Sequence, residues 1–354
     1  MAKLGAWVKE HLGLKPCPRK QSTDQPPFLP SVRRPITPTS FDTPTCLFFR
    51  LPYDIRSMIF SIAFGGRAFH VDIVHQERAW QWRGYVCLRN GPRLPSMRYA
   101  WLGPWLDACL QDREWCERTG NTPGLEAYRV GAMGFLLSCR QAYTEGIDVL
   151  YSANCISIQS EPLLLHLPQL IPLNRLASIT SLEMVIRAHH TDRDDGKPSL
   201  NLDHMKPILD NVTTHCHHLR SFCLSFVAHT KRSYRHELLD SPALPWNDAF
   251  CRSMNLRNMR VELPAMDYWR ASRGQVQPME YHPSEAPAKG PFGRSLWRCL
   301  DSEEPSVQFR AIERYPYPPL KLAVLEDGDE SVESAGYWLA EGESGPEQQY
   351  VTCF

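Results

Sequence analysis

The chain has no charge imbalance and no long apolar run. Lys and Arg number 39, as do Asp and Glu, so the formal net charge is +0 and no basic field exists to attract nucleic acid. The longest apolar stretch, residues 162–173, is interrupted by His166, Pro168 and Gln169 and is shorter than the roughly 20 residues of a membrane-spanning helix. We therefore expect neither a nucleic-acid partner nor a membrane partner.

Paired cysteines and a signal peptide are also missing. The 12 cysteines occur singly, with no CxxC pair, which is typical of reduced thiols inside a cell. The first twenty residues contain no uninterrupted apolar segment with a cleavage site of small residues. These features predict an intracellular protein, cytoplasmic or nuclear.

The standard catalytic motifs are incomplete. Residues 196–199, GKPS, lack the preceding glycine of a phosphate-binding loop, and a proline separates the lysine from the serine. Asp240 stands where a zinc-protease helix starting at His236 needs its second histidine, and neither GxSxG nor GxGxxG occurs. We expect no enzyme activity and no cofactor, with a divergent enzyme built from distant residues as an alternative.

Residues 215–218, HCHH, form the densest group of potential metal ligands. They could coordinate zinc if Cys223, His229 or His204 approached. Adjacent ligands rarely close one tetrahedron, however, and the separated ligand pairs of structural zinc sites are absent. The sequence therefore predicts no metal site here.

Composition divides the chain into regions. Residues 16–44 hold eight prolines, and residues 321–354 hold eight acidic residues against Lys321 alone, so both ends read as solvated tails. We predict a proline-rich basic disordered tail at 1–44, an F-box-like region with inserted strands and a Trp-rich helix at 45–160, a leucine-rich-like βα region at 161–270, a Pro/Gly-rich loop with C-terminal elements at 271–320, and an acidic tail at 321–354.

The second of these regions mixes strands and helices. Residues 69–74 and 85–89 are rich in β-branched and aromatic residues, which predicts two paired strands separated by a polar segment containing Trp80 and Trp82. A Trp-rich helix is expected from Pro104 to Gly120. Apolar residues spaced by three and four predict a second long helix, with Leu136 and Cys139 on its apolar face. Half of the ten tryptophans fall in this region, and we expect most of them in the core.

A weak repeat follows in three segments of the pattern LxxLxLxL, which are ITSLEMVI from Ile179, LRSFCLSF from Leu219 and LRNMRVEL from Leu256. The alternation places the last three apolar residues of each segment on one buried strand face. Helices expected at 203–216 and 245–254 lie between the segments, which favours parallel strands. The alternative is an ordinary α/β sheet whose strands match by chance.

Residues 51–64 predict a helix with two apolar faces, starting at Pro52 and ending at Gly65. Leu51, Ile55, Met58, Ile59 and Ile62 form the stripe expected to pack inside the domain, and Tyr53, Phe60 and Phe64 form the face expected to meet a partner. Burial of both faces within the chain is the alternative.

The same segment resembles a known family. LPYDIRSMIF, beginning at Leu51, is similar to the opening helix of F-box and F-box-like domains, which helps to bind the Skp-type adaptor of cullin ubiquitin ligases. Together with LLSCRQAYTEGIDVLYSAN at 136–154 and the later strands, it resembles the fungal domain-of-unknown-function family numbered 7730. The chain departs from an authentic F-box because about 70 residues separate its first helix from the next segment of the resemblance.

These observations predict a mixed α/β fold with an F-box-like helical element, followed by irregular leucine-rich-repeat-like units. The expected function is protein interaction, with the resemblance pointing to a substrate receptor that binds a Skp-type adaptor. The residues predicted to serve this binding are Leu51, Pro52, Ile55 and Ile59, which would place the helix, and Tyr53 and Phe60, which would meet the partner. The alternative is a structural or peptide-binding α/β protein that neither binds an adaptor nor catalyses a reaction.

Overall fold

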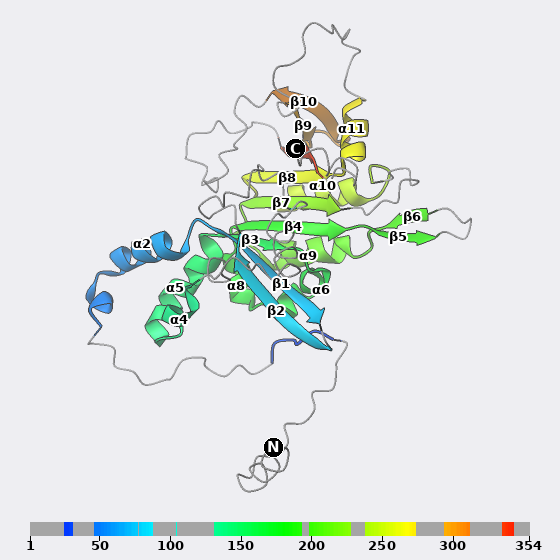
Figure 1. Cartoon of the computed structure of the whole chain (residues 1–354). Coiled ribbons are helices and arrows are strands. Elements are labelled where there is room, and N and C mark those ends of the chain that lie inside the picture. Colours follow the sequence, from blue (N-terminus) through cyan, green and yellow to red (C-terminus); the bar gives the residue numbers. More distant parts are fainter. Residues whose placement is uncertain are drawn as a thin grey trace, which may run out of the picture.

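A nine-stranded mixed sheet organises the protein (Figure 1). The structure, a computed structural model, describes residues 25–30, 46–76, 78–87, 104, 131–192, 198–227, 238–273, 294–311 and 335–342. The strands lie in the order β10-β9-β11-β8-β7-β4-β3-β1-β2, and β5 and β6 form a separate hairpin. The mixed α/β fold predicted from the sequence is confirmed.

The centre of the sheet is parallel and its margins are antiparallel. Strands β11, β8, β7, β4, β3 and β1 pair in parallel, whereas β2, β9 and β10 pair antiparallel with their neighbours. The strands are β1 (Ala68–Gln76), β2 (Ala79–Val86), β3 (Cys155–Ile158), β4 (Ser181–Arg187), β5 (His189–Asp192), β6 (Pro198–Asn201), β7 (Ser221–Val227), β8 (Asn258–Leu263), β9 (Arg294–Cys299), β10 (Ser306–Ala311) and β11 (Gly336–Glu341).

Helices occupy the connections between the parallel strands. Several of them, including α6, α8, α9 and α10, run behind the sheet in the view of Figure 1. The helical segments are η1 (Leu47–Arg50), α2 (Tyr53–Phe64), α4 (Met133–Leu136), α5 (Arg140–Ser152), α6 (Glu161–Leu165), α7 (Leu167–Leu170), α8 (Leu173–Ser178), α9 (Met205–His215), α10 (Ala243–Ser253) and α11 (Ala265–Arg273). Among the described residues, none of these helices has the length and apolar character needed to cross a membrane.

The three LxxLxLxL segments form neighbouring strands, as predicted. Strands β4, β7 and β8 lie side by side in parallel, with α9 between the first two in sequence and α10 between the last two. The rows that the alternation predicts to be buried are Leu182, Phe222 and Met259, followed by Met184, Leu224 and Val261. The likeness to a leucine-rich repeat itself stays a prediction.

Two details of the second region differ from the sequence expectation. Strand β2 begins at Ala79 and so includes Trp80 and Trp82, because a tight turn with Arg78 at φ 67° brings it directly back along β1. The expected second long helix is broken into α4 and α5, since Cys139 takes an extended conformation and its Sγ accepts a hydrogen bond from the Ala142 backbone at 3.3 Å. The helix expected from Pro104 to Gly120 lies outside the described residues except for Pro104.

Both predicted tails contain ordered contacts. Residues 336–341, expected in an acidic tail, form β11 between β8 and β9, where the alternating Tyr337 and Leu339 are fully buried, so this expectation is wrong for that segment. In the N-terminal region, the Leu29 backbone donates a hydrogen bond to the Gln169 carbonyl at 2.8 Å. In the region predicted at 271–320, residues 274–293 lie outside the described residues, and residues 271–273 belong to α11.

A buried carboxyl group lies on the opposite face of the sheet from the apolar side chains of β4, β7 and β8. Glu262 on β8 is 0% exposed, and its Oε2 accepts a hydrogen bond from Ser225 Oγ at 2.7 Å, while its Oε1 lies 2.8 Å from Arg260 Nη2. Burial raises the pKa of Glu262 to about 6, an effect that Arg260 and Ser225 only partly counter. The ionised form is therefore disfavoured in the folded state.

We expect this group to make stability depend on pH. The pKa of Glu262 is about 6 in the folded state and 4.5 ordinarily. The contribution of its protonated carboxyl group to the free energy of unfolding is therefore fully present below pH 4.5 and is lost as the pH rises through 6. The loss amounts to about 2 kcal/mol. Urea unfolding between pH 4.5 and 6.5 should show this decrease in the free energy of unfolding for the wild type but not for Glu262→Gln. If the free energy of unfolding depended on pH in the same way for both proteins, the carboxyl group would not be desolvated.

Candidate protein-interaction surface

Helix α2 projects from the sheet beside α4 and α5 (Figure 1). It begins after Leu51 and Pro52, where Pro52 is the N-cap residue and Asp54 lies in the first turn, near the positive end of the helix dipole. It ends at Gly65, where an added Cβ would lie 2.6 Å from the Ser61 carbonyl oxygen. The helix expected from the sequence is therefore confirmed, starting one residue later than predicted.

The inner face of α2 packs into an aromatic cluster. Phe60 is 2% exposed, and its ring centroid lies 5.4 Å from that of Phe48 and 5.8 Å from that of Phe135. Gly146 on α5 allows this close approach, since a Cβ there would lie 2.5 Å from the Leu136 side chain and 3.5 Å from the Phe60 ring. Phe60 is thus a core residue that joins η1, α4 and α5 to α2.

An ion pair fixes the N-terminal half of α2 to α5. Arg56 donates to Glu145 through both Nε and Nη2, each at 2.7 Å, and Nη1 donates to the Leu51 carbonyl. The Arg56 guanidinium lowers the pKa of Glu145, which also accepts a hydrogen bond from Gln141. Bidentate pairs of this kind fix orientation as well as distance, so α2 is held in one rotation about its axis.

Asn154 connects the other end of α2 to the end of α5. Its Nδ2 donates to the Phe64 carbonyl at 2.8 Å, and its Oδ1 accepts from the Arg67 backbone at 2.8 Å. The Gly66 backbone also donates to the Ala153 carbonyl at 2.8 Å. Helix α5 therefore returns to pack on α2 along its length, although a long insertion separates them in the sequence.

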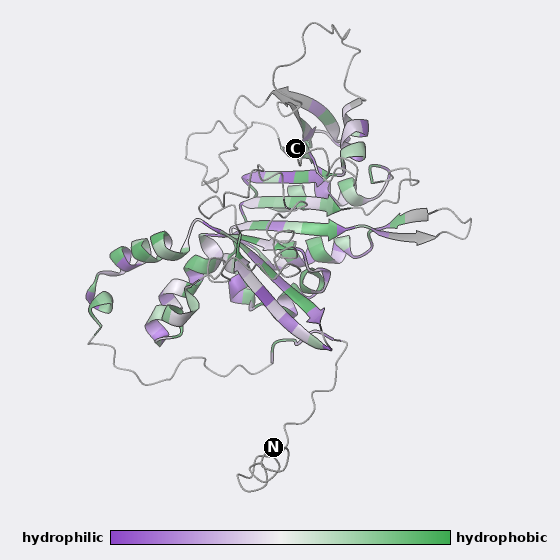
Figure 2. Ribbon diagram, in the orientation of Figure 1, coloured by the Kyte–Doolittle hydropathy of each residue, from purple (hydrophilic) through white to green (hydrophobic). Residues whose placement is uncertain are grey.

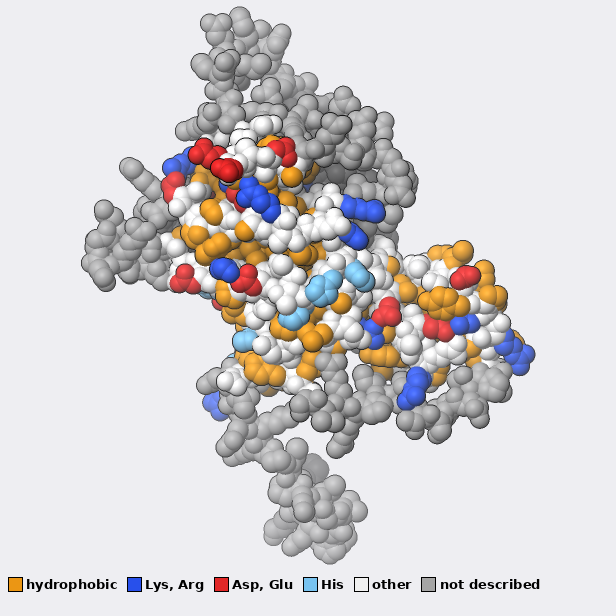
Figure 3. Space-filling model, turned by 180° about the vertical axis from the view of Figure 1, so that it is seen from behind, with side chains coloured by type: hydrophobic (Ala, Val, Ile, Leu, Met, Phe, Trp, Pro, Cys, Tyr) orange, Lys and Arg blue, Asp and Glu red, His pale blue; other side chains and the backbone are white. Residues whose placement is uncertain are grey.

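The outer face of α2 is apolar and exposed. Ile55 is 43% exposed, Met58 58%, Ile59 38% and Ile62 76%, and the four lie along one side of the helix. We call these four residues the outer stripe. Figure 2 shows that α2 is largely hydrophobic although it projects from the sheet. We call η1, α2, α4 and α5 together the helical lobe, and Figure 3 shows hydrophobic side chains on its surface. Contiguous exposed apolar surface of this kind is typical of interaction sites.

Three further exposed side chains belong to the elements that pack with α2. Leu47 on η1 is 73% exposed, and Met133 on α4 and Leu137 at its C-cap are each 46% exposed. These elements are joined to α2 through the rings of Phe48 and Phe135. Exposed apolar side chains of η1, of α2 and of the region around α4 therefore lie on elements that pack together.

The structure corrects the sequence prediction for both faces of α2, although Tyr53 is 59% exposed, as expected. Phe60, expected to meet a partner with Tyr53, is buried, and the stripe expected to pack inside the domain is outside. Both faces are apolar, so periodicity alone could not decide which one meets the aromatic rings of η1 and α4. Of the six residues predicted to serve partner binding, Leu51, Pro52, Tyr53, Ile55 and Ile59 are exposed and Phe60 is not.

The other sequence candidates do not converge on a site in the described residues. In the segment 215–218, Cys216 is buried and burial raises its pKa to about 12, whereas His217 and His218 are exposed. Trp80 packs against the core and Trp82 is 48% exposed, and the remaining tryptophans of that group lie outside the described residues.

Sequence reasoning missed a group formed by Glu161, His189 and His204, whose ligand atoms all lie within 4.8 Å of one another. No spacing motif marks these residues, because they come from three separate elements. The available signal was topological, since Glu161 and His189 each follow a strand of the parallel sheet, and the ends of such strands meet at one edge.

Comparison with known proteins identifies a family without assigning an activity. No curated protein and no solved structure matches the chain. The family model described as "Domain of unknown function (DUF7730)" matches residues 41–239, which include α2, α5 and the strands from β1 to β7. The match covers 199 of the 354 residues, more than half of the sequence, and the protein therefore belongs to the DUF7730 family.

Proposed function

We propose that this protein is an intracellular interaction module that binds a Skp-type adaptor of a cullin ubiquitin ligase through the outer stripe of α2. The observation that carries the proposal is an exposed apolar helix face held in place by buried contacts on its other side. The resemblance of the Leu-Pro helix to F-box openings supplies the class of partner. The role is binding without catalysis, in the cytoplasm or nucleus.

The contacts between α2 and α5 support this proposal. An F-box helix needs neighbouring helices to form a compact surface, and a long insertion separates α2 from α5 in this chain. The Arg56–Glu145 pair and the Asn154 hydrogen bonds hold the two helices together despite the insertion. The surface is therefore ordered before a partner arrives, which lowers the entropic cost of binding.

The exposed area is consistent with a modest but specific interface. Complete burial of one aliphatic side chain contributes roughly 1.5–3 kcal/mol, and the side chains of the outer stripe still have roughly half of that gain available. A standard interface needs about 800 Å² from each partner, more than one stripe supplies. Leu47, Met133 and Leu137 are the residues that would extend the contact area.

Met58 and Met266 provide a matched pair for the test. Met58 on α2 is 58% exposed and Met266 on α11, a helix packed at β8 and β11, is 57% exposed. We expect Met58→Asp to weaken adaptor binding at least tenfold, because an unpaired charge would be buried at the interface, and Met266→Asp to leave binding unchanged. Titration calorimetry of the full chain with a fungal Skp-type adaptor measures both affinities.

Both variants should melt close to the wild type, because the two side chains are mostly exposed. The proposal is wrong if the folded wild type fails to bind, or if the two substitutions weaken binding equally. A folded chain without adaptor binding would instead favour a structural or peptide-binding role.

A further inference from the structure

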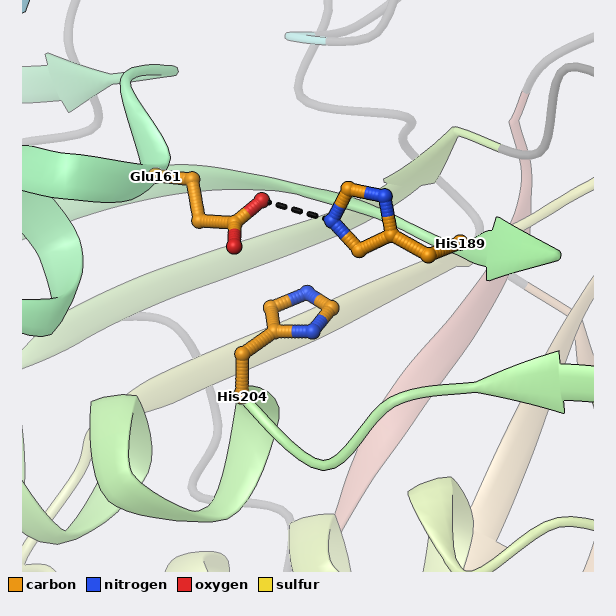
Figure 4. A group of neighbouring side chains, drawn as sticks. All are labelled: Glu161, His189 and His204. Carbon is orange, nitrogen blue, oxygen red and sulfur yellow. Dashed lines mark hydrogen bonds and ion pairs between the residues drawn. The ribbon is translucent and has the colours of Figure 1, made fainter. Parts of the chain in front are cut away.

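Glu161, His189 and His204 meet at the edge of the sheet where the parallel strands end. Glu161 starts α6 three residues after β3, His189 starts β5 two residues after β4, and His204 precedes α9. Because β3 and β4 are parallel neighbours, their carboxyl ends lie together. Figure 4 shows the three side chains directed toward one another from these elements.

The geometry of this group is close to that of a metal site. His189 Nε2 lies 2.8 Å from Glu161 Oε2, and the two imidazole rings have centroids 5.0 Å apart. Ligand atoms around a tetrahedral zinc ion are about 3.3 Å apart, given metal–ligand distances of about 2.0–2.1 Å. The three ligand atoms all lie within 4.8 Å of one another and would have to approach this spacing in the zinc-bound state, and the side chain of His189 is half-exposed.

One ring nitrogen of His204 is buried. Its Nε2 is buried and forms no hydrogen bond with any group in the described part of the chain. A buried polar atom of this kind is uncommon unless a ligand or water satisfies it. Burial lowers the pKa of His204, against the opposing effect of Glu161.

We propose that Glu161, His189 and His204 bind one zinc ion, which links α6, the β5–β6 hairpin and α9. Two imidazole nitrogens and one carboxylate oxygen are a donor set that zinc prefers, with water in the fourth position. A hard cation such as Mg²⁺ prefers oxygen ligands and is excluded by this set. The site uses no residue of α2, so it is independent of the proposed adaptor binding.

Zinc titration of the full chain, first freed of metal with a chelator, tests this proposal. We expect one Zn²⁺ per chain with a dissociation constant in the micromolar range or below, and no binding of Mg²⁺. His189→Ala and Glu161→Gln should each weaken zinc binding at least tenfold. Neither should disturb the fold, because the side chains of His189 and Glu161 are 52% and 33% exposed. The same variants should lose the increase in melting temperature that zinc produces in the wild type.

His217→Ala is the matched control, since it removes an exposed histidine of the 215–218 segment and leaves the proposed site intact. Its zinc affinity should equal that of the wild type. The proposal is overturned if the wild type binds no zinc, if His189→Ala and Glu161→Gln both bind it with the same affinity as the wild type, or if His217→Ala alone weakens binding.

Discussion

Replacing Phe60 with aspartate is expected to unfold the helical lobe. The substitution removes a ring that is 2% exposed and places an unpaired carboxylate among Phe48, Phe64 and Phe135. Loss of a buried phenylalanine alone costs about 3–5 kcal/mol, and the buried charge adds to that. We therefore expect the free energy of unfolding, measured by urea denaturation and circular dichroism, to fall by at least about 4 kcal/mol.

Ile62→Asp is the control on the same helix. Ile62 is 76% exposed, so the carboxylate remains in water and the urea midpoint should stay close to that of the wild type. Equal stability of the two variants would mean that Phe60 does not lie in the core. The pair thus tests which face of α2 is turned inward, separately from any partner.

Asp248→Ala is expected to destabilise the C-terminal side of the sheet by about 3–5 kcal/mol, the usual effect of leaving a buried charge unpaired. Asp248 on α10 accepts hydrogen bonds from Arg298 Nε and Nη2, both at 2.6 Å, and from the Tyr337 hydroxyl at 2.8 Å. These contacts join α10 to β9 and β11. The substitution would leave the Arg298 guanidinium and the Tyr337 hydroxyl without this acceptor.

A second Asp–Arg pair supplies the control. Asp240 and Arg270 also form two hydrogen bonds, at 2.7 and 3.2 Å, but their side chains are 60% and 54% exposed. Exposed pairs contribute little, so Asp240→Ala should leave the urea midpoint nearly unchanged. If both substitutions had the same effect, the hydrogen bonds of Asp248 would not contribute more to stability than those of the exposed Asp240.

The parallel core of the fold was predictable because its signal is local. The alternation in LxxLxLxL identifies the buried residues of β4, β7 and β8. In the helices between these strands, apolar residues recur every three or four positions. Strand β11 was missed although Tyr337 and Leu339 alternate in the same way, because the surrounding acidic residues suggested a tail. Its partner β8 is also more than 70 residues away, beyond the reach of a local pattern.

The candidate sites were predictable only in part. The sequence identified α2 and its two apolar faces, but the choice between the faces depends on Phe48 and Phe135, which reach Phe60 only in the folded chain. Similarly, Glu161, His189 and His204 are brought together by the pairing of β3 with β4 and by the return of the chain to α9. The spacing of residues in the sequence does not predict such long-range contacts.

Hydrogen–deuterium exchange of the full chain, alone and with a Skp-type adaptor, tests the central claim most directly. We predict that adaptor binding slows exchange in α2, residues 53–64, and in the neighbouring η1 and α4, with little change in β7 and β8. Slower exchange confined to the sheet, or the absence of a complex with folded protein, would contradict the claim that the outer stripe of α2 is the docking surface.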